Sequence, residues 1–328
     1  MFKPTLLAGL MLPVLLMSAA SLADTSSLTT QVKALWQAGD MQAAQALLSP
    51  MVTKKTKDAR LLALLGQTEA LINNADKAED LLEKAVKLDS NNADYQHWYA
   101  TVSCNLASSA SMFSALGYAK RCKNAYETAL ELAPQNPRSY IALGSFLAQA
   151  PGIAGGDKDK ALQLAARLKQ IEPLQGALLE LNASDLQNDA TFNALLAKDK
   201  LLTQRPETYL QRGVAFSRAD EHAKAMVLFE QALTMPASDD EAAEAKAQAL
   251  YQIGRSAVKG KLAVDKGIAA LQQFLAQQPA ADNIDWAKLR LGQLYIAQQQ
   301  QAKAEEILKP LLASTQDKEL KDELQKLL

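Results

Sequence analysis

The residues best suited to chemistry in this chain are two histidines, His97 and His222, and two cysteines, Cys104 and Cys122. A cysteine nucleophile needs a histidine base within about 3.2 Å of its sulfur. His97 and Cys104 are separated by one heptad on one predicted helix, which places them about 10.5 Å apart along the helix axis. A direct dyad on this helix is therefore excluded.

Metal binding and acid–base chemistry have equally little support. The His and Cys residues could formally hold zinc, but the sequence contains neither a C-x-x-C nor an H-E-x-x-H spacing. Asp and Glu are numerous, yet they alternate with Lys at offsets typical of a solvated helix surface. We expect no catalytic residue, no metal and no cofactor, and we predict that the chain is not an enzyme.

The elements that carry these residues are predicted to be helices. The 328 residues include only 14 Gly and 11 Pro, aromatic residues make up 5%, and the apolar content is mostly Ala and Leu. This composition favours helices over sheets. The 35 Lys and Arg nearly balance the 36 Asp and Glu, so no excess of positive charge is present to attract nucleic acid. We expect no nucleic-acid partner.

The first 23 residues are predicted to be a secretory signal peptide. Lys3 precedes an apolar run from Leu6 to Met17, and small residues stand at Ser21 and Ala23. Cleavage after Ala23 would give a periplasmic or secreted chain, residues 24–328, with no membrane span. The alternative is an uncleaved anchor, because the apolar run approaches the roughly 20 residues that cross a bilayer. Pro13 and the small residues weigh against it.

A repeat with a period near 34 residues organises the rest of the sequence. Ala44 to Ala78 spans 34 residues, and so does Gly66 to Ala100. In each unit a small residue on the first helix lets the second helix cross closely, the second helix carries an alanine, and a proline often follows. These positions are Gly66, Ala100, Gly144, Gly213, Gly254 and Gly292, then Ala78, Ala161, Ala225 and Ala304, then Pro134, Pro173 and Pro279.

This pattern resembles the tetratricopeptide repeat over essentially all of residues 24–328. The resemblance implies an all-α, right-handed α-solenoid of about eight helix-turn-helix units. The unit at 174–205 is degenerate, and a break between two lobes could fall within it. Leu320, Leu324, Leu327 and Leu328 form one apolar stripe, which predicts a C-terminal capping helix. The units are 25–58, 59–92, 93–136, 137–173, 174–205, 206–239, 240–281 and 285–318.

Two segments depart from the period. The unit at 93–136 is ten residues longer than the repeat and contains both cysteines. If its tip lies near Phe113, Cys104 and Cys122 are equidistant from it on antiparallel helices, which favours a disulfide in an exported protein. Such a bridge would stabilise the fold by roughly 3 kcal/mol. The alternative is two buried small side chains, since Cys122 falls where the repeat takes Ala.

The second departure is the glycine-rich segment from Ala150 to Ala161. Its glycines could gather backbone N–H groups at a helix start, which would suit an anion. However, the sequence matches neither a dinucleotide loop nor a P-loop, and Asp157 is expected to cap the helix and to repel phosphate. We predict a structural turn. Together with the long hairpin, this segment resembles a subgroup of bacterial exported tetratricopeptide proteins, a resemblance that implies no activity.

The family resemblance also implies which positions line the concave groove. Cations outnumber anions at these positions, where only Asp94 and Glu207 are acidic, so we predict a mildly basic groove. The candidate partner-binding residues are Tyr251, Arg255, Lys259 and Arg290, which cluster across adjacent units, with Arg138, His97 and Trp98. The other groove positions are Arg60, Gln67, Thr101, Asn105, Ser145, Gln149, Gln211, Arg218, Gln252 and Gln293. The alternative is that these are merely exposed residues on a long surface.

From these features we predict a non-enzymatic, exported scaffold or adaptor in envelope assembly or secretion. Its groove would bind a protein or peptide, either through acidic side chains or through a C-terminal carboxylate. The alternative is a permanent structural subunit of an envelope complex, for which a large apolar concave patch would be expected. A further alternative, an enzyme using the long hairpin, would need a polar pocket around His97.

Overall fold

The computed structural model describes residues 17–277 and 283–328, and it describes side chains from residue 27 onward. Most of the predicted leader, residues 1–23, and Pro279 lie outside this part of the chain. The first described helix, α1 (Met17–Gln37), spans the predicted cleavage point after Ala23. A search of the described residues finds no helix with the length and apolarity needed to cross a membrane.

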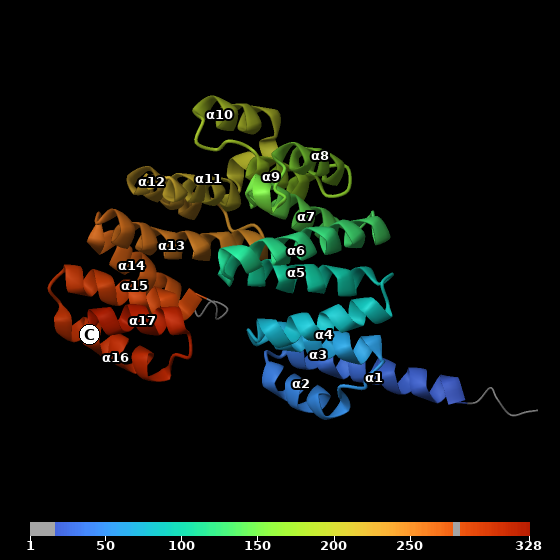
Figure 1. Ribbon diagram of the computed structural model, residues 1–328. Coiled ribbons are helices and arrows are strands. Elements are labelled where there is room, and N and C mark those ends of the chain that lie inside the picture. Colours follow the sequence, from blue (N-terminus) through green and yellow to red (C-terminus); the bar gives the residue numbers. More distant parts are fainter. Residues whose placement is uncertain (1–16, 278–282) are drawn as a thin grey trace, which may run out of the picture. The chain divides into compact units, whose positions relative to one another are not determined.

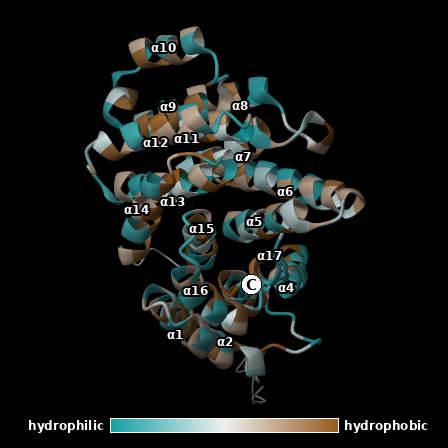
Figure 2. Cartoon of the chain, turned by 90° about the vertical axis from the view of Figure 1, so that its left-hand side faces the viewer, coloured by the Kyte–Doolittle hydropathy of each residue, from teal (hydrophilic) through white to brown (hydrophobic). Residues whose placement is uncertain are grey.

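Every regular element in the described residues is helical, as predicted, and the helices follow one another as hairpins (Figure 1). Hydrophilic and hydrophobic residues alternate along them, as expected of amphipathic helices (Figure 2). After α1 come α2 (Met41–Leu48), α3 (Ala59–Leu71), α4 (Ala75–Leu88), α5 (Ala93–Ser109), α6 (Met112–Leu132), α7 (Pro137–Gln149), α8 (Lys158–Leu168), α9 (Pro173–Ala183), α10 (Asp189–Lys198), α11 (Pro206–Arg218), α12 (His222–Thr234), α13 (Asp240–Gly260), α14 (Val264–Ala276), α15 (Ile284–Ala297), α16 (Gln301–Ser314) and α17 (Lys318–Leu327).

The chain divides into two compact units. The first contains residues up to Ser139 together with 153–155, and the second contains Tyr140–Gly152 and Gly156–Leu328. The division therefore falls within α7 and not within 174–205, where the sequence allowed for a break. The reason is that α9 and α10 contribute Leu181 and Phe192 to the main core of the second unit, so this segment is continuous with the hairpins that follow it.

Close helix crossings hold the hairpins together at the predicted small residues. A Cβ atom added at Gly66 of α3 would lie 2.8 Å from Leu82 Cγ of α4. One added at Gly213 of α11 would lie 2.5 Å from the Phe229 ring of α12. The alanines at Ala78, Ala161, Ala225 and Ala304 are fully buried. Any larger side chain at these positions would push the two helices apart.

Gly144 departs from this rule. It was expected to face the second helix of its own hairpin, but a Cβ at Gly144 would instead lie 2.5 Å from Leu179 on α9, the first helix of the next hairpin. Gly144 therefore serves the contact between successive hairpins.

The long hairpin consists of α5 and α6, and its extra residues lengthen both helices. A disulfide joins Cys104 of α5 to Cys122 of α6, whose Cα atoms are 5.2 Å apart. The turn lies at Ala110 and Ser111, not near Phe113, because α6 already begins at Met112. The expected equal spacing of the cysteines from the tip is therefore wrong, and the first turn of α6 extends beyond the paired part of the hairpin.

The glycine-rich segment is a structural turn, as predicted. Gly155 has a positive φ of 97°, which favours glycine. The backbone N–H of Gly156 donates to the Pro151 carbonyl, and that of Asp157 donates to the Leu147 carbonyl. Asp157 caps α8, since its carboxylate accepts from the Lys160 N–H. These N–H groups are used within the fold, which leaves them no role in holding an anion.

The chain ends with α17, which packs against α15 and α16. Leu320 and Leu324 are buried in this contact. The charged side chains of α17 lie on its other faces, which is the arrangement a helix covering an exposed core would have.

Candidate functional site

The first group of predicted site residues lies in the first unit. The Arg138 guanidinium lies 5.6 Å from the centre of the Trp98 ring, and its Nη1 atom is 3.5 Å from the Asp94 carboxylate. Arg138 is exposed and Trp98 is half-buried, so both can be reached from solvent. The structure therefore brings together a cation, an aromatic face and a carboxylate at the junction of α5 and α7.

His97 belongs to this group but is buried. Its ring lies 5.4 Å from the ring of Tyr126 on α6, and its Nδ1 atom has no hydrogen-bond partner. Burial, with a smaller contribution from the Arg138 charge, lowers the pKa of His97 to about 4. The imidazole is therefore neutral near pH 7. Because it is buried, it contributes to the core of the hairpin and is poorly accessible to a partner.

The second group of predicted site residues lies in the second unit, on α13 and α15. Tyr251 is buried, with its ring 5.7 Å from Phe274. Burial raises the pKa of Tyr251, while the charges of Arg290 and Arg255 oppose that rise. Both guanidinium groups thus lie within electrostatic reach of one phenol. Lys259, one turn further along α13, is exposed.

Arg290 was predicted to be a partner-binding residue in the groove, but its guanidinium already has partners within the chain. It is only 9% exposed, its Nη1 atom donates to Gln293 at 2.9 Å and to Glu323 of α17 at 3.4 Å, and it lies 5.4 Å from the Trp286 ring. These contacts bind the terminal helix to α15. Arg255 is half-buried and is the more accessible of the two arginines.

A pocket of about 520 Å³ in the second unit gathers other predicted groove positions. Gln149 of α7, Gln211 of α11 and Arg218 of α11 line it. The Gln211 Oε1 atom is buried without a hydrogen-bond partner. Arg218 is exposed and pairs with no carboxylate among the described residues. The remaining lining residues are Ala148, Lys158, Asn182, Ser184, Asp185, Leu186, Gln187, Leu210, Val214 and Ala215.

Lys158 was missed by the sequence analysis. It is the first residue of α8, directly after the glycine-rich turn. Counting along the repeat does not assign this position to the groove. The turn carries it to the rim of the pocket, where it and Arg218 supply the two cations. Asp185 is the one acidic residue that lines the pocket.

A cavity of about 540 Å³ in the first unit has a similar composition. It lies between α1, α3 and α5, and it includes Arg60 and Gln67 from the predicted groove positions. The Gln67 side-chain amide donates to Asp94 at 3.3 Å. Lys33 and Arg60 are its two cations and Asp94 its one acid. Each unit therefore has a cavity whose lining carries one excess positive charge.

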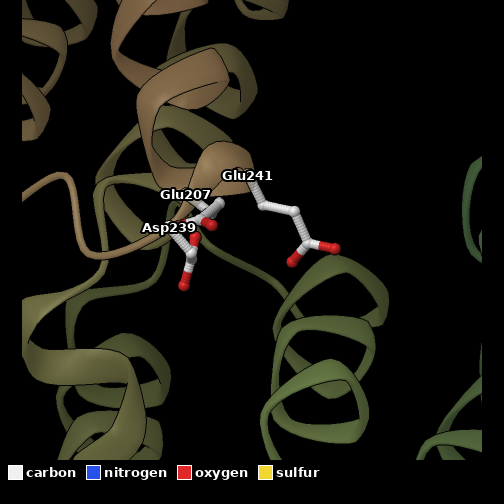
Figure 3. A group of neighbouring side chains, drawn as sticks. All are labelled: Glu207, Asp239 and Glu241. Atoms are coloured by element: carbon white, nitrogen blue, oxygen red, sulfur yellow. The ribbon is translucent and has the colours of Figure 1, made fainter.

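Three carboxylates in the second unit lie close enough to suggest a metal site, those of Glu207, Asp239 and Glu241 (Figure 3). However, Arg205 already neutralises this group. Its guanidinium donates to Glu207 and to Asp239 at 2.5 Å, and the amide of Gln175 donates to Glu241 at 2.7 Å. These contacts fasten α9 and α11 to the start of α13, so the structural role accounts for all three acids.

The described residues also bear on nucleophilic chemistry. Because Cys104 is in the disulfide, it has no free thiol to act as a nucleophile. His222 lies at the start of α12, where its Nε2 atom is 3.5 Å from Asp220. Neither histidine is paired with a serine or cysteine nucleophile in the described part of the chain.

Comparisons with known proteins agree on a helical-repeat fold. The family model described as Regulator of microtubule dynamics protein 1-3 matches residues 28–150, less than half of the chain. A comparison with curated proteins found no match. Yeast Tom70 has a similar solved structure, with a TM-score of 0.57 at 14% identity over 88% of this chain. The chain spans 58% of the length of that Tom70 structure.

Two bacterial tetratricopeptide repeat proteins of known structure match at lower similarity. The protein from Parabacteroides merdae has a TM-score of 0.48 at 15% identity, with 92% of this chain and 97% of that chain covered. The protein from Thermus thermophilus has a TM-score of 0.44 at 15% identity, with 69% of this chain and 98% of that chain covered.

Proposed function

Because this chain has the tetratricopeptide-repeat fold, we propose that it is a non-enzymatic scaffold that binds an extended segment of a protein partner. The observation that carries this proposal is the pocket between α7, α9 and α11, where Gln149, Gln211, Lys158 and Arg218 converge. Side-chain amides can pair with the carbonyl and N–H groups of an extended peptide.

The charges of the pocket favour a carboxylate on the bound peptide. Lys158 and Arg218 are both exposed, and neither makes an ion pair among the described residues, so a ligand would not have to displace an existing partner. A guanidinium binds a carboxylate through two parallel hydrogen bonds. We expect either an acidic side chain or the C-terminal carboxylate of the partner to occupy this position.

The compartment is part of the same proposal. We propose that the chain is exported, that the leader is removed after Ala23, and that the protein acts in the periplasm or outside the cell, in envelope assembly or secretion. The Cys104–Cys122 disulfide supports export, because disulfides persist in oxidising compartments. The charged and amide side chains in both cavities favour reversible binding over a permanent subunit contact.

The test is capture of partners from an envelope extract by the immobilised protein, followed by synthetic peptides that cover each captured protein. A double variant, Lys158→Glu with Arg218→Glu, should lose the partner and the peptide. The matched control, Lys318→Glu with Lys326→Glu, makes the same charge change on exposed positions of α17 and should bind normally. Equal binding by both variants would remove the pocket from the proposal.

A further inference from the structure

The first turns of α6 expose large apolar side chains at the tip of the long hairpin. Phe113 is 92% exposed and Met112 is 80% exposed, and Leu116 lies one turn further on at 38%. Ile153, in the glycine-rich turn, is 84% exposed. Elsewhere in the described residues the most exposed large apolar side chain is Val227 at 64%. The two segments that depart from the repeat therefore carry the most exposed apolar residues.

The exposed apolar residues of α6 share one face of that helix with two lysines. With 100° between successive residues of a helix, Met112, Phe113, Leu116, Lys120 and Lys123 fall within about 100° of one another around α6. The glycine-rich turn adjoins this face, since a Cβ atom at Gly155 would lie 3.1 Å from Cδ of Lys123. We call these five residues of α6, together with Ile153, the apolar–basic tip.

The part of the hairpin around its tip carries only positive charge. Residues 95–126 contain no Asp or Glu, although the whole chain has 36 of them. Arg121 points to the opposite side of α6, where it pairs with Glu79 at 2.6 Å. Lys120 is exposed and makes no ion pair among the described residues, and the same holds for the half-buried Lys123. The cations beside the exposed apolar side chains are therefore free to meet an anionic surface.

The hairpin holds this tip in a fixed position. The Cys104–Cys122 disulfide joins α5 to the middle of α6, and the paired parts of the two helices pack against each other (Figure 1). A preorganised tip loses little conformational entropy when it binds.

We propose that the apolar–basic tip docks on the surface of an anionic lipid bilayer. Protruding apolar side chains enter the boundary between headgroups and acyl chains, while neighbouring lysines meet the anionic headgroups. A stable protein interface needs at least about 1,000 Å² of buried surface, and a few projecting side chains at a helix tip supply much less. The tip would hold the scaffold at the membrane surface.

The first experiment uses the full chain with a tryptophan introduced as Phe113→Trp, mixed with vesicles whose acyl chains are brominated. Bromine quenches tryptophan only on contact, and the parent chain, which has 3 tryptophans of its own, gives the baseline. Quenching of the variant beyond that baseline reports insertion of the side chain at position 113. With phosphatidylcholine and phosphatidylglycerol at 3:1, we expect strong quenching that declines with added salt. The control Val227→Trp, an exposed apolar position on α12, should not be quenched.

The second experiment measures vesicle affinity through the same quenching in a Phe113→Trp background. Lys120→Glu should weaken binding by at least about tenfold, since each cation near an anionic surface contributes about fivefold. Absence of quenching at position 113, equal quenching on pure phosphatidylcholine, or full affinity of Lys120→Glu would overturn the proposal. Capture of a protein that requires Met112 and Phe113, without vesicle quenching, would assign the tip to a protein partner and would also overturn it.

Discussion

The α5–α6 and α11–α12 hairpins occupy equivalent places in the repeat but differ where their helices cross. In α11–α12 the helices cross at Gly213, whose missing side chain leaves room for the Phe229 ring. In α5–α6 the equivalent first-helix position is Ala100, and the second helix carries Cys122 in place of alanine, bonded to Cys104. Both hairpins are packed, and in α5–α6 the residues present add a covalent bond to that packing.

Removing the disulfide should give the largest difference between the two hairpins. Cys104→Ala with Cys122→Ala is expected to lower the free energy of unfolding by about 3 kcal/mol, because the unfolded chain loses a closed loop. Urea unfolding followed by circular dichroism, with and without reductant, provides the measurement. Reductant should lower the free energy of unfolding of the parent and leave that of the double variant unchanged. If reductant also destabilises the double variant, the destabilisation does not come from the disulfide.

Filling the close crossing in α11 should be the next largest effect. Gly213→Val is expected to lower the free energy of unfolding by about 2 to 3 kcal/mol, since the added methyl groups would clash with Phe229. The same urea experiment measures it, and reductant should not alter the difference from the parent. An unchanged midpoint would mean that α11 and α12 can separate at no cost, contrary to the packing described.

Acid should weaken the α5–α6 hairpin through His97. The pKa of His97 is about 4 in the folded chain, below its ordinary value of about 6.5, so its stabilising contribution is present above pH 6.5 and is lost as the pH falls from 6.5 toward 4. Protonation of His97 alone should make the free energy of unfolding about 2 kcal/mol lower at pH 5 than at pH 7. His97→Phe should remove that part of the pH dependence, which urea titrations at the two pH values would detect.

The smallest expected effect is a gain at Gly117 in α6. A Cβ atom at this glycine would have no neighbour within 4 Å, so Gly117→Ala should raise the free energy of unfolding by about 0.7 kcal/mol through helix propensity alone. Calorimetry can resolve the accompanying rise in melting temperature. A lower free energy of unfolding in Gly117→Ala would indicate that the added methyl group clashes with a neighbouring atom.

The fold was predictable because small residues recur at a fixed period where the helices cross. Gly66, Gly213 and Gly292 occupy close crossings that admit no side chain, and such steric requirements appear directly in the sequence. The direction of a crossing was less predictable, as Gly144 shows. Its position in the repeat is normal, but its nearest neighbour is Leu179 of the next hairpin.

The sequence predicted which positions of the repeat carry site residues, but it did not predict which other side chains those residues contact. Arg290 stands at a groove position, yet its partner Glu323 lies 33 residues further on, beyond the last repeat. Repeat counting carries no information about such a contact. Lys158 shows the opposite case: it has no groove position by counting, but the glycine-rich turn delivers it to the pocket beside Arg218.

The cysteine pair also has a consequence for biogenesis. The sequence holds 2 cysteines, and they lie on neighbouring helices of one hairpin, separated by 18 positions. Within one molecule only a single pairing exists, so oxidation cannot trap an incorrect intramolecular bridge. The hairpin can be oxidised as soon as α5 and α6 have met, before the hairpins that follow are complete. Mispairing would require a second molecule, and non-reducing electrophoresis would reveal it as a covalent dimer.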